Sequence, residues 1–291
     1  MRRAHLILVT HTPDRIRRTL LGASVQTVPP ASVTLTCDGD DDAIRDAASS
    51  ACAEFGLGLT LIRRAHAGVS RSAQVRNNGV RHLIETGAAD DDALVFLDGD
   101  CVPEAKLIAK HLDALTHAGL VLGWRYDLHK DQDEAFDEDA LRRGEHPITP
   151  TPEQEHALAK RRQRFLKQAR LRALGLARLG LVKAHKPKLI TANFATTLGH
   201  YRAVNGIDET YEGWGQEDDD FARRLYQRAV RPFVGVGTIH TYHQYHVTRA
   251  PGEWHQSPNA ERLNKKPATQ CARGLEDPMD QPQVVIEHLG H

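Results

Sequence analysis

Two aspartates one residue apart are the sharpest chemical signal in the sequence. Asp98 and Asp100 follow the apolar run 93–97, and Gly99 stands between them. A buried strand that ends in this way exposes both carboxylates at the edge of its sheet. Carboxylate oxygens are hard ligands, of the kind that Mg²⁺ and Mn²⁺ prefer when these ions also carry phosphate groups. The sequence therefore predicts a divalent metal site formed by Asp98 and Asp100.

A second acidic segment follows a Gly-Trp-Gly turn at residues 213–215. Four consecutive acids occupy positions 217–220, and the apolar residues Phe221 and Leu225 after them recur with the period of a helix. The acids therefore stand at a helix N-terminus, where the helix dipole favours their ionised form. One ionised carboxylate could serve as a general base. Trp214 offers a flat apolar face of the kind that packs on a sugar ring.

Three histidines at a spacing of three residues form the third candidate. His240, His243 and His246 follow the strand-like segment 232–239. Imidazole is a common metal ligand, so the spacing suggests metal contact. The alternative is that these side chains fill the core or lie on the surface, where His and Tyr clusters also occur.

The first hundred residues contain the elements that would position these groups. Short apolar runs alternate with segments of helical periodicity, and this alternation predicts an α/β fold with a mostly parallel sheet and helices on both faces. The predicted strands are 5–10, 32–37, 57–62 and 93–97, and the predicted helices are 13–25, 41–55 and 70–87. Ligands of such sheets bind beyond the carboxyl ends of the strands. Thr10, His11 and Asp38 follow strands and join the candidates.

Composition narrows the class of protein. The 291 residues carry 38 Lys and Arg against 38 Asp and Glu, so the net charge is zero and argues against a general nucleic-acid binder. The four cysteines form no C-x-x-C pair, which argues against a zinc ribbon or a disulfide scaffold and favours a reducing cytoplasm. The sequence has no apolar run long enough for a spanning helix, so we expect a soluble or at most peripheral protein.

The middle of the chain is strongly polarised in charge. Residues 126–145 are rich in acids, whereas 156–207 contain none and hold many Lys and Arg. A capping box at Thr151 predicts a helix to about Leu179. This basic helix (152–180) could lie on anionic lipid at the inner membrane face or contact a phosphate-bearing acceptor, and a solvated helix packed on the catalytic domain fits equally well. The tail from 251 has little periodicity before a short segment at 284–289, and it is predicted to be a loop or a poorly ordered end.

Taken together, these segments resemble an inverting glycosyltransferase of the GT-A type. They are most similar to family 2 enzymes whose second half resembles the C-terminal region of galactosyltransferases and chondroitin polymerases. One set of motifs matches the nucleotide-sugar half: 24–30, 37–40, 68–70 with 76–79, and 96–103. A second set matches the acceptor half: 204–209 and 213–220. These matches divide the chain into a nucleotide-sugar half at 1–125 and an acceptor half at 189–250, with a tail at 251–291. Between the halves, 126–188 is an acidic loop plus a basic helical insertion that is not part of the motif set.

The resemblance also implies a role for each candidate residue. The donor would be a UDP-sugar and the acceptor a hydroxyl on a glycan or another molecule, with Mn²⁺ or Mg²⁺ as cofactor and no nucleic acid as partner. The implied nucleotide-sugar contacts are Thr10, His11, Asp38, Arg76, Asn77, Asp98 and Trp214. The implied metal ligands are Asp100, Asp98 and His243, with His246 second. The implied catalytic residues are Asp218 as general base and Glu217, which with Trp214 would hold the sugar or the acceptor.

The sequence departs from the family pattern in two places. Cys37-Asp38-Gly39-Asp40 stands where Asp-Asp-Gly-Ser is usual, and Asn205-Gly206-Ile207-Asp208 stands where Gly-Gly-Phe-Asp is usual. The resemblance implies a hexosyltransferase. The chemistry of sugar transfer also fits the residue types independently, because a cation would stabilise the departing diphosphate and one carboxylate would deprotonate the acceptor. The alternatives are a two-metal phosphodiesterase or nuclease that uses Asp98, Asp100, Asp218 and Asp219, and a non-catalytic nucleotide-sugar-binding module.

Overall fold

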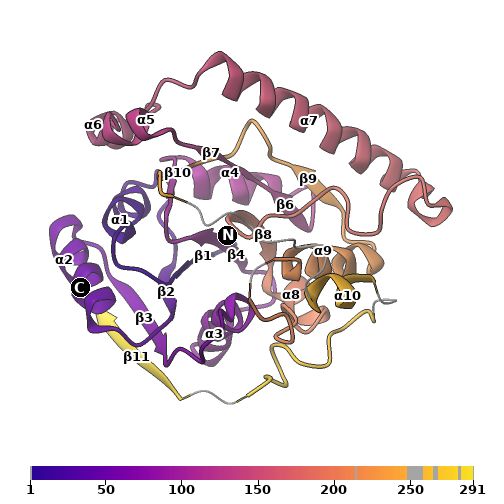
Figure 1. Cartoon of the computed structure of the whole chain (residues 1–291), viewed down its shortest axis with the longest axis horizontal. Helices are drawn as coiled ribbons and strands as arrows, with labels where there is room; N and C mark the ends of the chain where they lie inside the picture. Colours follow the sequence, from indigo (N-terminus) through magenta and orange to yellow (C-terminus); the bar gives the residue numbers. More distant parts are fainter. Residues whose placement is uncertain (1, 214, 248–257, 265–267, 281–282, 291) are drawn as a thin grey trace.

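The structure is a computed structural model and describes residues 2–213, 215–247, 258–264, 268–280 and 283–290. Its first half alternates strands and helices as the sequence predicts (Figure 1). The elements are β1 (Ala4–Thr10), α1 (Ile16–Ser24), β2 (Ser32–Asp38), α2 (Asp42–Phe55), β3 (Leu59–Arg64), α3 (Ser72–Glu85) and β4 (Ala93–Asp98). Both α2 ends follow sequence signals, because Asp41 caps the N-terminus and Gly56 adopts the left-handed conformation at the C-terminus.

The second half adds shorter elements around this unit. The segment after β4 contains β5 (Cys101–Pro103), α4 (Leu107–Ala114), β6 (Leu120–Leu122) and β7 (Trp124–Asp127). The insertion holds α5 (Lys130–Glu134), α6 (Glu138–Arg142), α7 (Pro152–Ala173) and the 3₁₀ helix η1 (Leu176–Leu179). The remainder is β8 (Asn193–Thr197), α8 (Leu198–Ala203), α9 (Glu217–Gln227), β9 (Pro232–Val234), β10 (His240–His243), α10 (Pro258–Asn264) and β11 (Val284–Leu289).

One eight-stranded sheet joins both predicted halves of the chain. Its order is β11-β3-β2-β1-β4-β8-β6-β9, and β3, β2, β1 and β4 run parallel. Strand β8 comes from the predicted acceptor half and pairs antiparallel with β4 and β6, both from the predicted nucleotide half. The two sequence segments therefore share one sheet, which confirms the predicted α/β class with a mostly parallel sheet.

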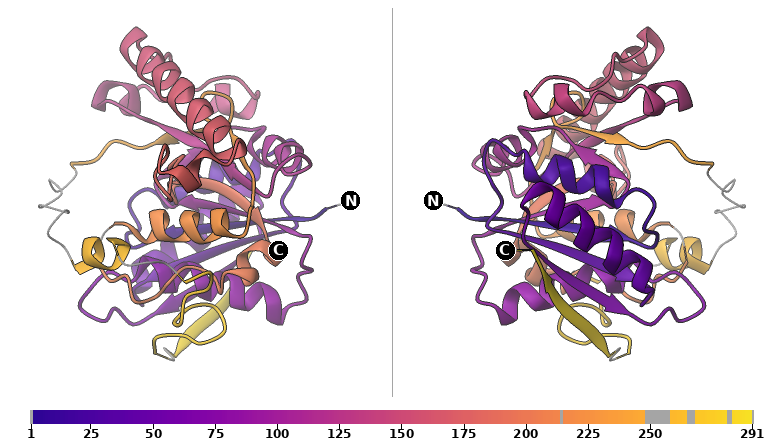
Figure 2. Two further views of the ribbon diagram at one scale, coloured as in Figure 1. Left: turned by 90° about the vertical axis from the view of Figure 1, so that its right-hand side faces the viewer. Right: turned by 90° about the vertical axis from the view of Figure 1, so that its left-hand side faces the viewer.

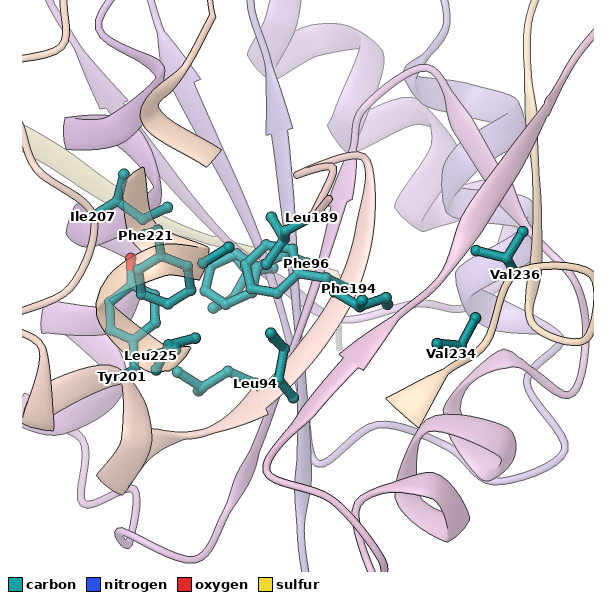
Figure 3. Close-up of a cluster of buried hydrophobic side chains, with 14 of the residues drawn as sticks. Leu94, Phe96, Leu189, Phe194, Tyr201, Ile207, Phe221, Leu225, Val234 and Val236 are labelled. Atoms are coloured by element: carbon teal, nitrogen blue, oxygen red, sulfur yellow. The ribbon is translucent and has the colours of Figure 1, made fainter. Parts of the chain in front are cut away.

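The sheet alternation divides the core between its two faces. Leu6, Leu8, Val95 and Leu97 pack with α1, α2 and α4 on one face. Leu94 and Phe96 point to the other face, which α3, α8 and α9 cover (Figures 1 and 2). On that face Phe96 stacks on Phe194 of β8 with ring centroids 4.6 Å apart, and Tyr201 and Phe221 lie beside them in Figure 3. This aromatic group fixes α9 against the strand that ends in Asp98.

The C-terminal tail differs from the prediction. Residues 258–264 form α10 and residues 284–289 form β11, which pairs antiparallel with β3 at the edge of the main sheet (Figure 1). The expectation of a loop or a poorly ordered end is wrong for these residues, although the sequence sets 284–289 apart as a short segment. What the pattern does not reveal is the edge of β3, which offers backbone hydrogen bonds to this segment. None of the described helices combines the length and the apolar character that crossing a bilayer requires.

Candidate active site

The two predicted aspartates end β4 at the carboxyl edge of the sheet. Gly99 between them is required by space, because a Cβ at this position would lie 2.7 Å from the Cβ of Thr10 and 3.1 Å from the carbonyl oxygen of Val9. The absence of a side chain lets the turn press against the end of β1. Asp98 and Asp100 thus leave a packed strand at a rigid turn, as the motif predicts.

Asp100 meets two histidines from a distant part of the chain. Strand β10 pairs antiparallel with β5 and sets His243 opposite Cys101, next to Asp100. The Nε2 atoms of His243 and His246 each lie 3.2 Å from Oδ2 of Asp100, and they lie 3.2 Å from each other. Within the described part of the chain, this trio is the one group of His, Cys, Asp or Glu side chains arranged to hold a metal ion.

The trio fits a divalent ion in geometry and in chemistry. Atoms bound to one ion at about 2.1 Å lie roughly 3 to 3.4 Å apart, which is the spacing of these three donors. One carboxylate and two imidazoles suit Mn²⁺ better than Mg²⁺, which prefers oxygen ligands. His246, the second choice from the sequence, therefore stands beside His243 as an equal donor.

Asp127 holds His243 from its other ring nitrogen. Its Oδ1 lies 3.0 Å from Nδ1 of His243, and a carboxylate in this place fixes the ring orientation of a metal-binding histidine. Although burial opposes the charged imidazole, hydrogen bonds to Asp100 and Asp127 raise the pKa of His243 to about 9. In the sequence, Asp127 is one acid of the acid-rich segment 126–145, because its role depends on the pairing of β7 with β10.

His240 does not join the trio. In a strand, residues three positions apart point to opposite faces, so His240 and His243 separate across β10. His240 is buried near the rings of Tyr126 and His146, and burial lowers the pKa of its imidazole to about 4. Its role is to fill space in the core, which is the alternative that the sequence left open.

A chain of hydrogen bonds joins Asp98 to the second acidic segment. Arg76 of α3 donates to Oδ1 of Asp98 at 2.6 Å and to the carbonyl of Ser72 at 3.1 Å. The hydroxyl of Ser72 donates to Glu217 at 3.0 Å. The first turn of α3 therefore connects the end of β4 with the start of α9, and the two motifs lie on one side of the molecule. Asp98 binds Arg76 and is not part of the metal trio, so its predicted metal contact is not supported.

Asp218 stands in the first turn of α9 in an environment unlike that of Asp100. Its side chain is 13% exposed, and Nζ of Lys188 lies 3.7 Å from its Oδ2. Burial, then the charge of Glu217, raises the pKa of Asp218 to about 7, although Lys188 opposes the shift. The sequence predicted that the helix dipole keeps these acids ionised. For Asp218, burial and the neighbouring carboxylates act against the dipole.

The next two acids have structural partners. Asp219 lies within 4.0 Å of Lys186 and Lys188, and Asp220 is buried against Arg223 and Arg224 at 2.7 Å. Arg224 in turn donates to the carbonyls of Val204 and Gly206. Asp220 therefore has a structural role, Asp219 shares Lys188 with Asp218, and Asp218 and Glu217 stay the candidates for chemistry that the sequence predicts.

Three of the residues predicted to contact the nucleotide lie at the ends of strands, as expected. Thr10, His11 and Asp38 lie at the ends of β1 and β2, where the hydroxyl of Thr10 donates to the carbonyl of Thr12 and His11 is exposed. Asp38 accepts hydrogen bonds from Arg64 and from the backbone N–H of Arg71, so the β3–α3 loop holds it. Trp214 lies outside the described residues.

Asn77 is the clear error among the nucleotide-site predictions. It is fully buried, and its amide nitrogen donates to the carbonyl of Ile207 and to Glu209. Its amide oxygen accepts from the hydroxyl of Tyr201 and from the backbone of Ile207. All four hydrogen bonds that an amide can make are used, so no polar atom is left for a nucleotide. Asn77 instead anchors α3 to the segment before α9.

Two family models match the sequence. One is described as glycosyltransferase like family 2 and covers residues 5–170, more than half of the chain. The other is described as the N-terminal domain of galactosyltransferase and covers residues 179–252. No curated protein matches the chain in sequence.

Solved structures share the fold at low identity. TarS 1–349 from S. aureus in complex with UDP aligns with a TM-score of 0.51 and 12% identity, over 82% of this chain and 60% of that one. GalNAc-T7 with UDP, GalNAc and Mn²⁺ aligns with a TM-score of 0.58 and 15% identity, over 90% of this chain and 47% of that one. The chain thus spans about 60% of TarS 1–349 and 47% of GalNAc-T7.

The family match and the shared fold agree with the arrangement of the site. The match at 5–170 contains β1 to β4 with the Asp98–Asp100 turn, and the match at 179–252 contains the start of α9 and the histidines of β10. The chain therefore belongs to glycosyltransferase like family 2, a family of glycosyltransferase enzymes, and has the GT-A fold.

Proposed function

We propose that the chain transfers a sugar from a UDP-sugar to an acceptor hydroxyl, in a metal-dependent reaction that inverts the anomeric carbon. Asp218 is the general base of this reaction. The acceptor oxygen forms the new bond to the anomeric carbon, its proton passes to Asp218, and UDP leaves with the electron pair of the broken bond. The donor assignment is supported by TarS, which has been solved with UDP and with UDP-GlcNAc.

The single observation that carries the proposal is the hydrogen-bonded link between the two acidic motifs. Asp98, Arg76, Ser72 and Glu217 follow one another at 2.6, 3.1 and 3.0 Å. One substrate can therefore reach both the Asp98–Asp100 turn and the start of α9. A transferase needs this proximity, since its leaving group and its base act on opposite sides of one carbon atom.

At the leaving-group end, Asp100, His243 and His246 would hold Mn²⁺. When bound, such an ion supplies Lewis-acid stabilisation of the negative charge that develops on the diphosphate. The chain's own contribution is orientation, because Asp127 fixes the ring of His243 and Arg76 fixes Asp98. Arg125 adds positive charge beside the trio, and its pKa is raised by the acids around it although burial opposes the charge.

At the acceptor end, Asp218 would accept the proton. Burial and Glu217 raise its pKa to about 7, so the ionised form is a stronger base than an exposed aspartate. Lys188 at 3.7 Å keeps a share of Asp218 ionised near neutral pH. Glu217, held by Ser72, would orient the sugar or the acceptor.

The two-metal hydrolase is not favoured by this arrangement. A second ion would need Asp218 and Asp219 to face the Asp100 cluster, yet these two acids have Lys186 and Lys188 as their charged partners. Two lysines beside a pair of carboxylates replace the charge of a second cation.

A panel of nucleotides and UDP-sugars tests the proposal. The melting temperature of the purified chain is measured with each compound, with and without Mn²⁺, and UDP release is measured for every sugar. We expect stabilisation by UDP and by at least one UDP-sugar that requires Mn²⁺, because a ligand bound only to the folded state stabilises it by RT ln(1+[L]/Kd). Stabilisation by UDP without any turnover of a UDP-sugar supports the binding module instead, and stabilisation by no uridine nucleotide contradicts the donor assignment.

A further inference from the structure

The basic insertion ends in a surface of unusual composition, which we call the α7 tip and define as residues 160–183. It contains the C-terminal part of α7, the 3₁₀ helix η1 and the turn back toward the sheet. Figures 1 and 2 show α7 along one margin of the molecule, outside the layers that cover the sheet. The tip is therefore presented to the surroundings on a projecting element.

Large apolar side chains on the tip are strongly exposed. Leu174, Leu179 and Leu181 are 63%, 72% and 62% exposed, and Leu166 is 44% exposed. Leu166 and Leu174 stand two turns apart along one side of α7, with Arg170 midway between them. Phe165 and Leu158, on the other side of the helix, are buried. The outer face thus carries leucines that the fold does not use.

The same surface is entirely basic in charge. No Asp or Glu occurs between residues 156 and 207. Seven Lys and Arg side chains of the tip are exposed: Lys160, Arg162, Arg164, Lys167, Arg170, Arg178 and Lys183. The other arginines of this stretch turn inward, since Arg161 lies over the ring of Trp124 and Arg172 over that of Tyr226. The chain as a whole is neutral, so this is a local concentration of positive charge.

Hydrogen bonds within the chain fix the α7 tip to α9, the helix that begins with the acids 217–220. Arg172 donates to the carbonyls of Lys183, Ala184 and Lys186, which closes the returning chain onto α7. The hydroxyl of Tyr226, in α9, donates to the carbonyl of Pro187. Hydrogen bonds therefore hold the segment that carries the exposed leucines, and they fix its position relative to α9.

We propose that the α7 tip docks on a membrane surface that contains anionic lipid. Leucines that enter the boundary of the acyl chains, surrounded by Lys and Arg that meet anionic headgroups, are the two components of interfacial binding. Charge complementarity decides the occupant. A second copy would bring seven like charges against seven, and a nucleic acid would give the leucines no apolar partner. The docking does not depend on the transfer reaction.

Docking would also set the orientation of the active site. Lys186 and Lys188 follow the tip in the chain and lie beside Asp219 and Asp218. With the tip on the membrane, the start of α9 would lie close to the lipid surface. An acceptor carried at that surface would then reach the proposed base without leaving the membrane.

Vesicle sedimentation tests the proposal on the full chain. The probes are vesicles of phosphatidylcholine alone and of phosphatidylcholine mixed with phosphatidylglycerol. We expect binding to the mixed vesicles that falls with added salt, with at least about tenfold weaker binding to the neutral ones. Leu179 and Leu181 are strongly exposed and lie two residues apart. The double substitution Leu179→Asp with Leu181→Asp should weaken binding to mixed vesicles at least about tenfold. Lys167→Glu with Arg170→Glu should have a similar effect.

A matched control uses the second exposed apolar spot of the chain, on β11. Val284→Asp with Val285→Asp introduces the same two charges and should leave vesicle binding unchanged. Melting curves show that each variant is folded. Equal binding to both vesicle types, no binding at low salt, or unchanged binding by the Leu179 and Leu181 variant would each overturn the proposal. A dimer in sedimentation velocity that the same variant converts to a monomer would assign the tip to a second copy instead.

Discussion

The turn after β4 and the start of α9 contain the same residue type in opposite electrostatic settings. Asp100 faces His243, His246 and the charge of Arg125, and the hydrogen bond from His243 holds the pKa of Asp100 well below its usual value although burial opposes this. Asp218 is also shielded from water, but Glu217 and Asp219 stand beside it, and burial with these carboxylates raises its pKa to about 7 although Lys188 opposes the shift. Neighbours, not residue type, therefore decide the protonation of each carboxylate.

The difference assigns a separate task to each region. A carboxylate that stays ionised at any physiological pH suits a metal ligand. A carboxylate that titrates near neutrality suits a group that must take up a proton during the reaction. Substitutions in the two regions should therefore have different effects on metal binding and on the rate.

Asp218→Asn removes the proposed base and keeps the shape of the side chain. We expect UDP release from the preferred UDP-sugar to fall by about 10² to 10⁴-fold, the usual contribution of a general base. Binding of UDP with Mn²⁺ should change little, because Asp218 lies outside the metal trio. The matched control is Asp219→Asn, one residue along the helix, whose effect on the rate should be much smaller. Equal losses in both variants would show that the cluster acts only on stability.

Asp100→Ala and His246→Ala each remove one donor of the metal trio. We expect more than about 100-fold weaker Mn²⁺ binding in isothermal titration, since loss of an outer partner alone costs roughly 10- to 100-fold. Metal-dependent binding of UDP should be lost with it. The matched control is His240→Phe, which changes the histidine of β10 that faces the core. If that variant weakened Mn²⁺ binding as much, the trio would be the wrong set of ligands.

Asp127→Asn tests the outer partner of His243. Because the carboxylate fixes the imidazole from its Nδ1 side, we expect Mn²⁺ affinity to fall by about 10-fold, and by 100-fold at most. The melting temperature without metal should change little, since Asp127 is exposed. Asp139→Asn changes a carboxylate of α6 that is 79% exposed, and this control should leave the affinity unchanged. An unchanged affinity in Asp127→Asn would remove this residue from the site.

Lys188→Met tests the balance of charge around Asp218. The lysine lowers the pKa of that carboxyl, so its removal should raise the pKa and move the rising limb of the kcat/KM profile to higher pH. Near pH 7 we expect about a twofold to fivefold loss of rate that is recovered at higher pH. Lys183→Met, five residues earlier and exposed, is the control. A rate loss that is the same at every pH would contradict the electrostatic role.

Much of this arrangement was predictable from local patterns. The apolar runs predict the parallel strands. Asp41 and Gly56 stand at the two ends of α2, and Gly99 between two acids indicates the turn that presents both carboxylates. The acids before Phe221 gave the start of α9. Each of these features depends on neighbouring residues within one element, where spacing alone carries the information.

The remainder depends on contacts between distant segments. Asp127 needed the pairing of β7 with β10, and β11 needed the free edge of β3. Asn77 stands in a motif typical of a nucleotide site, yet only the packing of α3 on the chain near Ile207 shows that its amide is fully used. Strand alternation separates His240 from the metal trio, but the strand-like segment predicted from the sequence ends at 239, so the alternation across β10 appears only in the structure.

The most direct test measures two quantities on two variants. For Asp100→Ala and Asp218→Asn, the Kd of UDP with Mn²⁺ and the rate of sugar release from the preferred UDP-sugar are determined side by side. We predict that Asp100→Ala weakens nucleotide binding strongly, whereas Asp218→Asn binds UDP as the unchanged protein does and loses the rate alone. If both variants lose binding and rate in the same proportion, the two carboxylate regions do not have separate tasks.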